Sequence, residues 1–256
     1  MINFTSKPRY MLDDLIRLVH ALRAPGGCPW DAAQTHLSIR RNFLEEAYEA
    51  CEALDCDDEA MLREELGDVL LQVLFHADIE ADRGRMTIDD IADAECRKLI
   101  FRHPFLFGGE RASWDELKKQ EKGQKTTGEA MQGVARSLPA TWRAEKIQKK
   151  AAKTGFCWES AGQALDKLAE EAQELREAVR DNTNIDEELG DMLFAAVRVA
   201  STLDKDPEQA LHSACEKFIR RFTAMEQSIL AEGRTLEEVS REELLASWDA
   251  QKRNGR

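Results

Sequence analysis

The sequence lacks the features of several common protein classes. Aromatic residues make up only 7% and β-branched residues are sparse, whereas Ala, Leu, Glu, Lys and Arg are plentiful, a balance that favours helices. No apolar run is long enough to cross a bilayer, and the first residues show no signal-peptide pattern. We therefore expect a cytoplasmic protein that does not insert into a membrane.

Several catalytic templates are also missing. The sequence contains no P-loop, no GxSxG, no HExxH and no ExxH pair of the kind that di-iron bundles require. No CxxC pair or zinc-like spacing occurs among the six cysteines. We expect these cysteines to be reduced and mostly buried as small hydrophobic residues. They are Cys28, Cys51, Cys56, Cys96, Cys157 and Cys215.

Positive charge is in short supply. The sequence has 36 basic and 49 acidic residues, which gives a formal net charge of −13. Nucleic-acid binding relies on basic surface, so we expect no direct nucleic-acid partner. A small anionic ligand that arrives with its own metal ion stays compatible with this charge.

Acidic residues, by contrast, follow a repeated pattern. Two pairs of acids occur on predicted helices, and the two members of each pair lie three residues apart. A second copy of this arrangement lies downstream. The first copy comprises Glu46, Glu49, Glu65 and Asp68, and the second comprises Glu171, Glu174, Glu188 and Asp191.

Other motifs recur in the same order. CRKLIFR at 96–102 matches CEKFIRR at 215–221, and SWDELK at 113–118 matches SWDAQK at 247–252. The ordered set indicates an internal duplication. We predict an all-α fold of tandem helical bundle domains, at 1–120 and 151–256, joined by a connector and a helix at 121–150.

The stripe of acids on an otherwise apolar helix indicates a cation. In ELGDVLLQVLFHA at 65–77, apolar residues cover most of the circumference, which predicts a buried helix. Glu65 and Asp68 share one stripe with Gln72 and His76, and ELGDMLFAAVRVA repeats this with Arg198 near the stripe. Buried acids are costly unless they are paired or bind an ion. Oxygen ligands alone suit Mg²⁺, with Mn²⁺ as a substitute.

Alternatives stay open for several of these residues. The acids on 44–54 lie opposite the apolar stripe and alone would form a solvated face. Lys217, Arg220 and Arg221 either meet phosphates or form an exposed basic face. Trp248 either stacks on a base or caps the bundle core, while Trp30 and Trp158 are expected to pack.

The assembled motifs resemble the MazG family of nucleoside triphosphate pyrophosphohydrolases, within the all-α NTP pyrophosphatases. The family pattern EExxE followed by ExxD reads Glu45-Glu46-x-x-Glu49 with Glu65-x-x-Asp68, and Glu170-Glu171-x-x-Glu174 with Glu188-x-x-Asp191. The segments GCPWD, RHPFLFG, SLPATWRAEKIQKKAAKTGF and KFIRRF are similar to two-domain bacterial MazG, so that the resemblance covers nearly the whole chain.

The resemblance implies a homodimer that hydrolyses NTPs such as ATP, and dNTPs, to the monophosphate and pyrophosphate at the α–β phosphoanhydride with Mg²⁺. It assigns the activity to the C-terminal domain. Metal ligation would fall on Glu171, Glu174, Glu188 and Asp191. Substrate contacts would fall on Lys167, Lys217, Arg220, Arg221 and Trp248.

The N-terminal copy keeps Glu46, Glu49, Glu65 and Asp68, and also Lys98, Arg102 and Trp114, so a second metal site there stays open, although Phe101 replaces the counterpart of Arg220. For hydrolysis, Glu170 or Glu187 is the candidate to accept a proton from the attacking water. A different interpretation is a nucleotide- or protein-binding regulatory module without turnover. A third is an enzyme restricted to one modified nucleotide.

Overall fold

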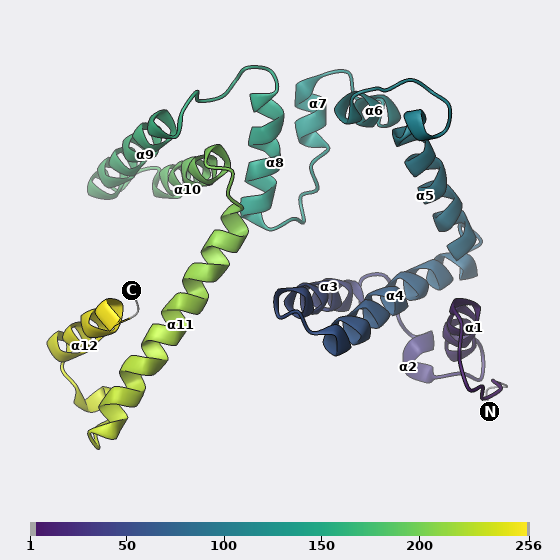
Figure 1. The fold of residues 1–256 in the computed structure, drawn as a ribbon, viewed down its shortest axis with the longest axis horizontal. Coiled ribbons are helices and arrows are strands. Elements are labelled where there is room, and N and C mark those ends of the chain that lie inside the picture. The colour runs from purple at the N-terminus through teal and green to yellow at the C-terminus, as the bar shows by residue number, and fades with distance from the viewer. Residues whose placement is uncertain (1–3, 255–256) are drawn as a thin grey trace. The chain divides into compact units, whose positions relative to one another are not determined.

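The structure, a computed structural model, describes residues 4–254 and confirms the all-α prediction. Within that range every regular element is an α-helix or a 3-10 helix, and no strand occurs. The chain forms two compact units, one up to Lys118 and one from Lys119 (Figure 1). No helix in the described range is long and apolar enough to span a membrane.

The first unit contains two long helices that pair, together with shorter elements. Asp58 caps the start of α4 by accepting hydrogen bonds from the backbone of Ala60 and Met61, as helix starts require. Its elements are α1 (Leu12–Arg23), α2 (Pro29–Ala32), α3 (Arg40–Asp55), α4 (Glu59–Asp82), α5 (Ile88–Arg102), η1 (Pro104–Leu106) and the start of α6 (Trp114–Glu121).

The second unit repeats a paired arrangement of long helices. Asn182 and Asn184 adopt left-handed backbone conformations, which asparagine tolerates well, in the short turn between the paired helices. Its elements are α7 (Thr127–Gln132), α8 (Ala140–Ala152), α9 (Ala161–Asp181), α10 (Ile185–Thr202), α11 (Pro207–Ala231), η2 (Leu236–Glu238) and α12 (Arg241–Asn254).

The segment 121–150, which we predicted as a connector and a helix, holds two helices. α7 begins at a capping box in which Thr126 and Glu129 exchange hydrogen bonds, so this polar stretch is more ordered than expected. α8 begins directly after Pro139, within the range where a helix was predicted. Gln148 of α8 donates a hydrogen bond of 2.7 Å to the Phe194 carbonyl of α10. This bond holds α8 against α10 within the second unit. The domain boundaries themselves stay a prediction.

Each unit contains a small cluster of buried apolar residues. In the first unit Val19 of α1, Ile39 before α3 and three residues of α4, Leu74, Phe75 and Ile79, form a buried cluster. In the second unit Met225, Ile229 and Val239 form another at the far end of α11. The first cluster includes the C-terminal half of α4, and the second lies between α11 and α12, so neither covers the acids at the N-terminal ends of α4 and α10.

Burial on α4 and α10 differs from the prediction. Both helices were expected to be buried all round, yet Leu66 and Leu70 are 53% and 36% exposed, and Leu189 and Leu193 are 40% and 57% exposed. The helical wheel shows which residues are apolar, but it does not show whether this chain alone covers them. Leu66 and Leu70 stand at the same positions of the first copy as Leu189 and Leu193 of the second.

Two other burial predictions were wrong. Five cysteines are exposed and Cys28 is half-buried, although all six are free thiols. Trp30, which was expected to pack, is 61% exposed on α2. Both differences have the same cause, because the small apolar clusters of this chain leave at its surface residue types that are buried in most proteins.

Candidate functional site

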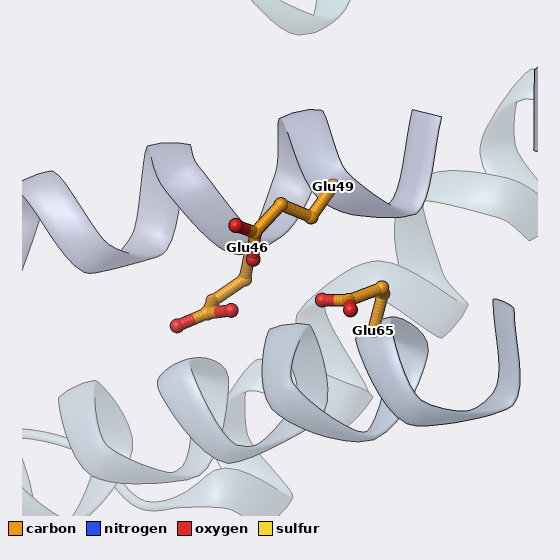
Figure 2. Close-up of side chains that lie close together, drawn as sticks. All are labelled: Glu46, Glu49 and Glu65. Atoms are coloured by element: carbon orange, nitrogen blue, oxygen red, sulfur yellow. The ribbon is translucent and has the colours of Figure 1, made fainter. Parts of the chain in front are cut away.

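The first acidic cluster forms where α3 and α4 face each other. Figure 2 shows Glu46 and Glu49 reaching from α3 toward Glu65 on α4. One carboxylate oxygen from each of the three lies within 4.8 Å of the others. The pairing of the two helices therefore turns the apparently solvated acids of α3 into one side of a cluster.

The second cluster has the same construction. Glu171 and Glu174 of α9 and Glu188 of α10 each place a carboxylate oxygen within 4.8 Å of the other two. Glu171 is buried, Glu188 is half-buried and Glu174 is exposed. The cluster is thus open on one side, where a ligand can approach.

The fourth acid of each set lies beside its cluster. The charge of Asp68 is among the causes that raise the pKa of Glu46. Asp191 lines a cavity together with Glu171. Both positions are compatible with the predicted ligand sets, although the tight groups contain three acids each.

Crowding of negative charge shows in the titration of these groups. Burial, followed by the charge of Asp68, raises the pKa of Glu46, and burial followed by the charge of Glu49 raises the pKa of Glu65. In the second cluster, a hydrogen bond with Glu171 and then burial raise the pKa of Glu174. A divalent cation would relieve this repulsion, and carboxylate oxygens are the ligands that Mg²⁺ prefers.

The two clusters differ in nearby positive charge. Lys167 donates from its Nζ to Glu170 at 2.8 Å and to Glu171 at 2.9 Å, and these two carboxylates raise the pKa of the lysine. Lys167 precedes Glu171 by four residues, and the residue four before Glu46 is Asn42. The second cluster therefore carries a cation at a position where the first carries a neutral amide.

A cavity of about 70 Å³ adjoins the second cluster. The sequence places Arg198 near the acid stripe without indicating a role, and it gives no sign that Trp158 and Gln148 line a cavity. An arginine on a stripe of a helix predicted to be buried was the available signal. The polar and aromatic residues around the cavity are Gln148, Trp158, Lys167, Glu171, Asp191 and Arg198.

Two groups of predicted substrate residues lie on other helices. Lys217 and Arg220 are exposed on α11, and Arg221 is half-buried there. Trp248 on α12 packs against the apolar cluster of the second unit, with its ring centroid 5.0 Å from that of Phe218. Figure 1 shows α11 running away from α9 and α10 towards α12. Their contacts with phosphate and base stay predictions.

The acid stripe of α4 continues into a partly buried polar network. The Nδ1 atoms of His36 and His76 lie within hydrogen-bond distance, 2.7 Å apart. His36 Nε2 lies 2.8 Å from Oε1 of Glu80. Burial, followed by the charge of His36, lowers the pKa of His76. In the first unit, the contacts of His36 at this end of the stripe therefore hold the segment before α3 against α4.

Comparison with known proteins matches both clusters to one family. The family model described as the MazG nucleotide pyrophosphohydrolase domain matches residues 34–107 and 160–224. These ranges contain every acid of the two clusters.

Full-length relatives are similar as well. A Thermotoga maritima protein named nucleoside triphosphate pyrophosphohydrolase/pyrophosphatase MazG is 41% identical over 94% of this chain and 96% of its own length. The Escherichia coli K12 protein named nucleoside triphosphate pyrophosphohydrolase is 40% identical over 94% of this chain and 97% of its own. A Bacillus subtilis protein, YabN, is 40% identical over 93% of this chain but 51% of its own length.

Proposed function

The chain belongs to the family of MazG nucleotide pyrophosphohydrolase domains, and on that premise we propose that it is an enzyme that hydrolyses nucleoside triphosphates to the monophosphate and pyrophosphate. The observation that carries the proposal is the open carboxylate cluster of Glu171, Glu174 and Glu188 beside a cavity with basic residues. The names of the full-length relatives support the same activity. We further propose that the α–β phosphoanhydride is cleaved in both NTPs and dNTPs.

We propose that Mg²⁺ is held by Glu171, Glu174 and Glu188 with Asp191. The set offers only oxygen ligands, and Mg²⁺ is usually bound by a few carboxylates and substrate phosphates. When bound, the cation would polarise phosphate oxygens of the substrate. Glu46, Glu49, Glu65 and Asp68 offer the same donor chemistry in the first unit.

The other side chains of the second unit have separable roles in this proposal. Lys167 holds Glu171 in place and is positioned to face anionic substrate oxygens. Because Glu170 is already paired with Lys167, Glu187 is the freer candidate to accept the proton of the attacking water. Lys217, Arg220 and Arg221 would offset negative charge on the departing pyrophosphate, and Trp248 would stack on the base.

We also propose a homodimer, which would cover the exposed apolar face of the paired helices. Leu189 and Leu193 lie one turn apart on α10, and burying such side chains is favourable by roughly 2 kcal/mol each. Leu193→Asp is expected to shift the protein to a monomer, because a dimer would then have to bury a carboxylate. Sedimentation analysis of the variant measures this. Leu165→Asp, at an exposed position on α9, serves as the control; dissociation by it alone would contradict the assignment of the face.

The activity is tested with a panel of the four NTPs and four dNTPs in the presence of Mg²⁺. The expected products are the nucleoside monophosphate and pyrophosphate, resolved by phosphorus NMR. Formation of the diphosphate and inorganic phosphate would reject cleavage at the α–β bond. Tight nucleotide binding without turnover would instead identify a binding module, and turnover of one nucleotide alone would identify a restricted enzyme.

A further inference from the structure

Arg198 of α10 is a buried cation beside the second cluster. It is 7% exposed, and its Nε atom is buried with no hydrogen-bond acceptor. Its guanidinium carbon lies 5.5 Å from the ring centroid of Trp158. Within the described part of the chain, no carboxylate forms a salt bridge with this guanidinium. A buried charge is strongly unfavourable unless it is paired, so the position calls for an anion closer than Glu171 and Asp191, which line the same cavity without forming a salt bridge to it.

The neighbouring groups hold the arginine at the cavity. The Trp158 face favours a cation, and an arginine stacked on an aromatic ring loses little freedom when it binds a ligand. Gln148 is itself 5% exposed, and its Nε2 donates to the Phe194 carbonyl at 2.7 Å while its Oε1 is buried and unpartnered. Of the two unsatisfied buried atoms at this cavity, Gln148 Oε1 is an acceptor, and the donor at Arg198 Nε is the one that indicates a binding site for an anion.

The first unit shows what the fold does without such a site. Arg198 stands ten residues after Glu188, and Phe75 stands ten residues after Glu65. Phe75 is buried in the apolar cluster with Val19 and Leu74. The paired helices can thus be built with an apolar residue at this position, so the helical pairing by itself does not require the arginine.

The location and size of the cavity limit what binds there. It is lined by Glu171 and Asp191, so an anion bound at Arg198 lies beside the carboxylate cluster. Its volume of about 70 Å³ accommodates a phosphoryl-sized group, whereas pockets for whole small molecules measure roughly 300 to 1,000 Å³. Arginine binds phosphate through several directed hydrogen bonds.

We propose that Arg198, backed by Trp158, forms a phosphate-binding subsite of the C-terminal site. The assignment of that phosphate to the polyphosphate of a nucleotide rests on the proposed function; the recognition of a phosphate anion does not. The subsite would draw one phosphoryl group against the carboxylate cluster and orient it there.

The test measures binding of inorganic tripolyphosphate by calorimetry, with and without Mg²⁺, so that turnover is not needed. Arg198→Met is expected to weaken tripolyphosphate binding about ten- to hundredfold, the value of a hydrogen bond to a charged group. The ligand-free variant should melt at the same temperature as the wild type or higher, because an unpaired buried charge has been removed. Arg198→Lys should keep part of the affinity.

Arg176→Met is the matched control, because it removes the same charge from an exposed position on α9. It should leave tripolyphosphate binding unchanged. Undiminished affinity in Arg198→Met overturns the subsite. The subsite is also overturned if Arg198→Met binds tripolyphosphate normally but binds adenosine poorly, because the cavity would then recognise the nucleoside.

A measurement on the wild-type protein does not depend on a variant folding well. The Nε–H resonance of Arg198 should shift when tripolyphosphate saturates the protein, and an unmoved resonance would contradict the proposal. The two proposals fail separately. A wild type that binds tripolyphosphate through Arg198 but releases no pyrophosphate from any NTP rejects only the enzymatic function. If the Arg198→Met variant turns over NTPs as well as the wild type does, only the subsite is rejected.

Discussion

Replacing Glu188 by glutamine is expected to lower pyrophosphate release from NTPs at least about a hundredfold. Glutamine keeps the shape of the side chain but exchanges a charged oxygen ligand for a neutral amide, at a position whose carboxylate lies within 4.8 Å of those of Glu171 and Glu174. Loss of even an outer-shell partner of a metal ligand costs roughly 10- to 100-fold. The measurement is kcat/KM for pyrophosphate release at saturating Mg²⁺.

Glu65→Gln is the matched control, since Glu65 holds the same place in the first cluster. Most of the activity should survive this change. The first unit has Asn42 and Phe75 where the second has Lys167 and Arg198, so it lacks these two positive charges, although it keeps Lys98 and Arg102 as the counterparts of Lys217 and Arg221. Comparable losses in both variants would show that both copies work, and an active Glu188→Gln protein would refute the C-terminal assignment.

Removal of divalent cations should have a still larger effect. Treatment with EDTA is expected to abolish turnover, and Mg²⁺ or Mn²⁺ should restore it, because the clusters offer carboxylate oxygens and no nitrogen or sulfur ligand. Independently of activity, Mg²⁺ should raise the melting temperature of the wild type by ligand linkage. The same rise in a protein with glutamine at residues 65 and 188 would show that the stabilising ion binds elsewhere.

The requirement for Mg²⁺ should increase as the pH falls. The pKa of Glu174 is raised by its hydrogen bond with Glu171 and by burial, so protons occupy this ligand at a higher pH than they would an isolated glutamate. A protonated carboxyl group does not bind the cation, and metal affinity therefore declines toward acid. Titrations of activity with Mg²⁺ at several pH values measure the effect; a constant half-saturation from neutral to mildly acidic pH would contradict it.

Most of the fold could be predicted because its signals are local. Pro139 directly before α8 and Thr87 at the N-cap of α5 are residue types that favour helix starts, and both helices begin at these residues. The missed helix, α7, also had a local signal in its capping box at Thr126 and Glu129, which was overlooked. Burial was predicted less well, because it depends on which surfaces meet and not on the periodicity of one helix.

The sequence by itself determined the chemistry of the acids and their spacing. Residues three apart on one helix share a face whatever the rest of the chain does, so the spacing alone pairs Glu171 with Glu174 and Glu188 with Asp191. Their resemblance to a family, also visible in the sequence, is confirmed by the family match.

Only the tertiary structure decided which of these faces meet. The turns after α3 and α9 fold each pair of helices back, so that acids of two helices come together and the acids of α3 do not form an isolated solvated face. The cavity of Arg198 needs α8, α10 and the segment before α9 at once, through Gln148 and Trp158. Contacts between residues so far apart in the chain depend on packing, and no spacing within a single helix encodes them.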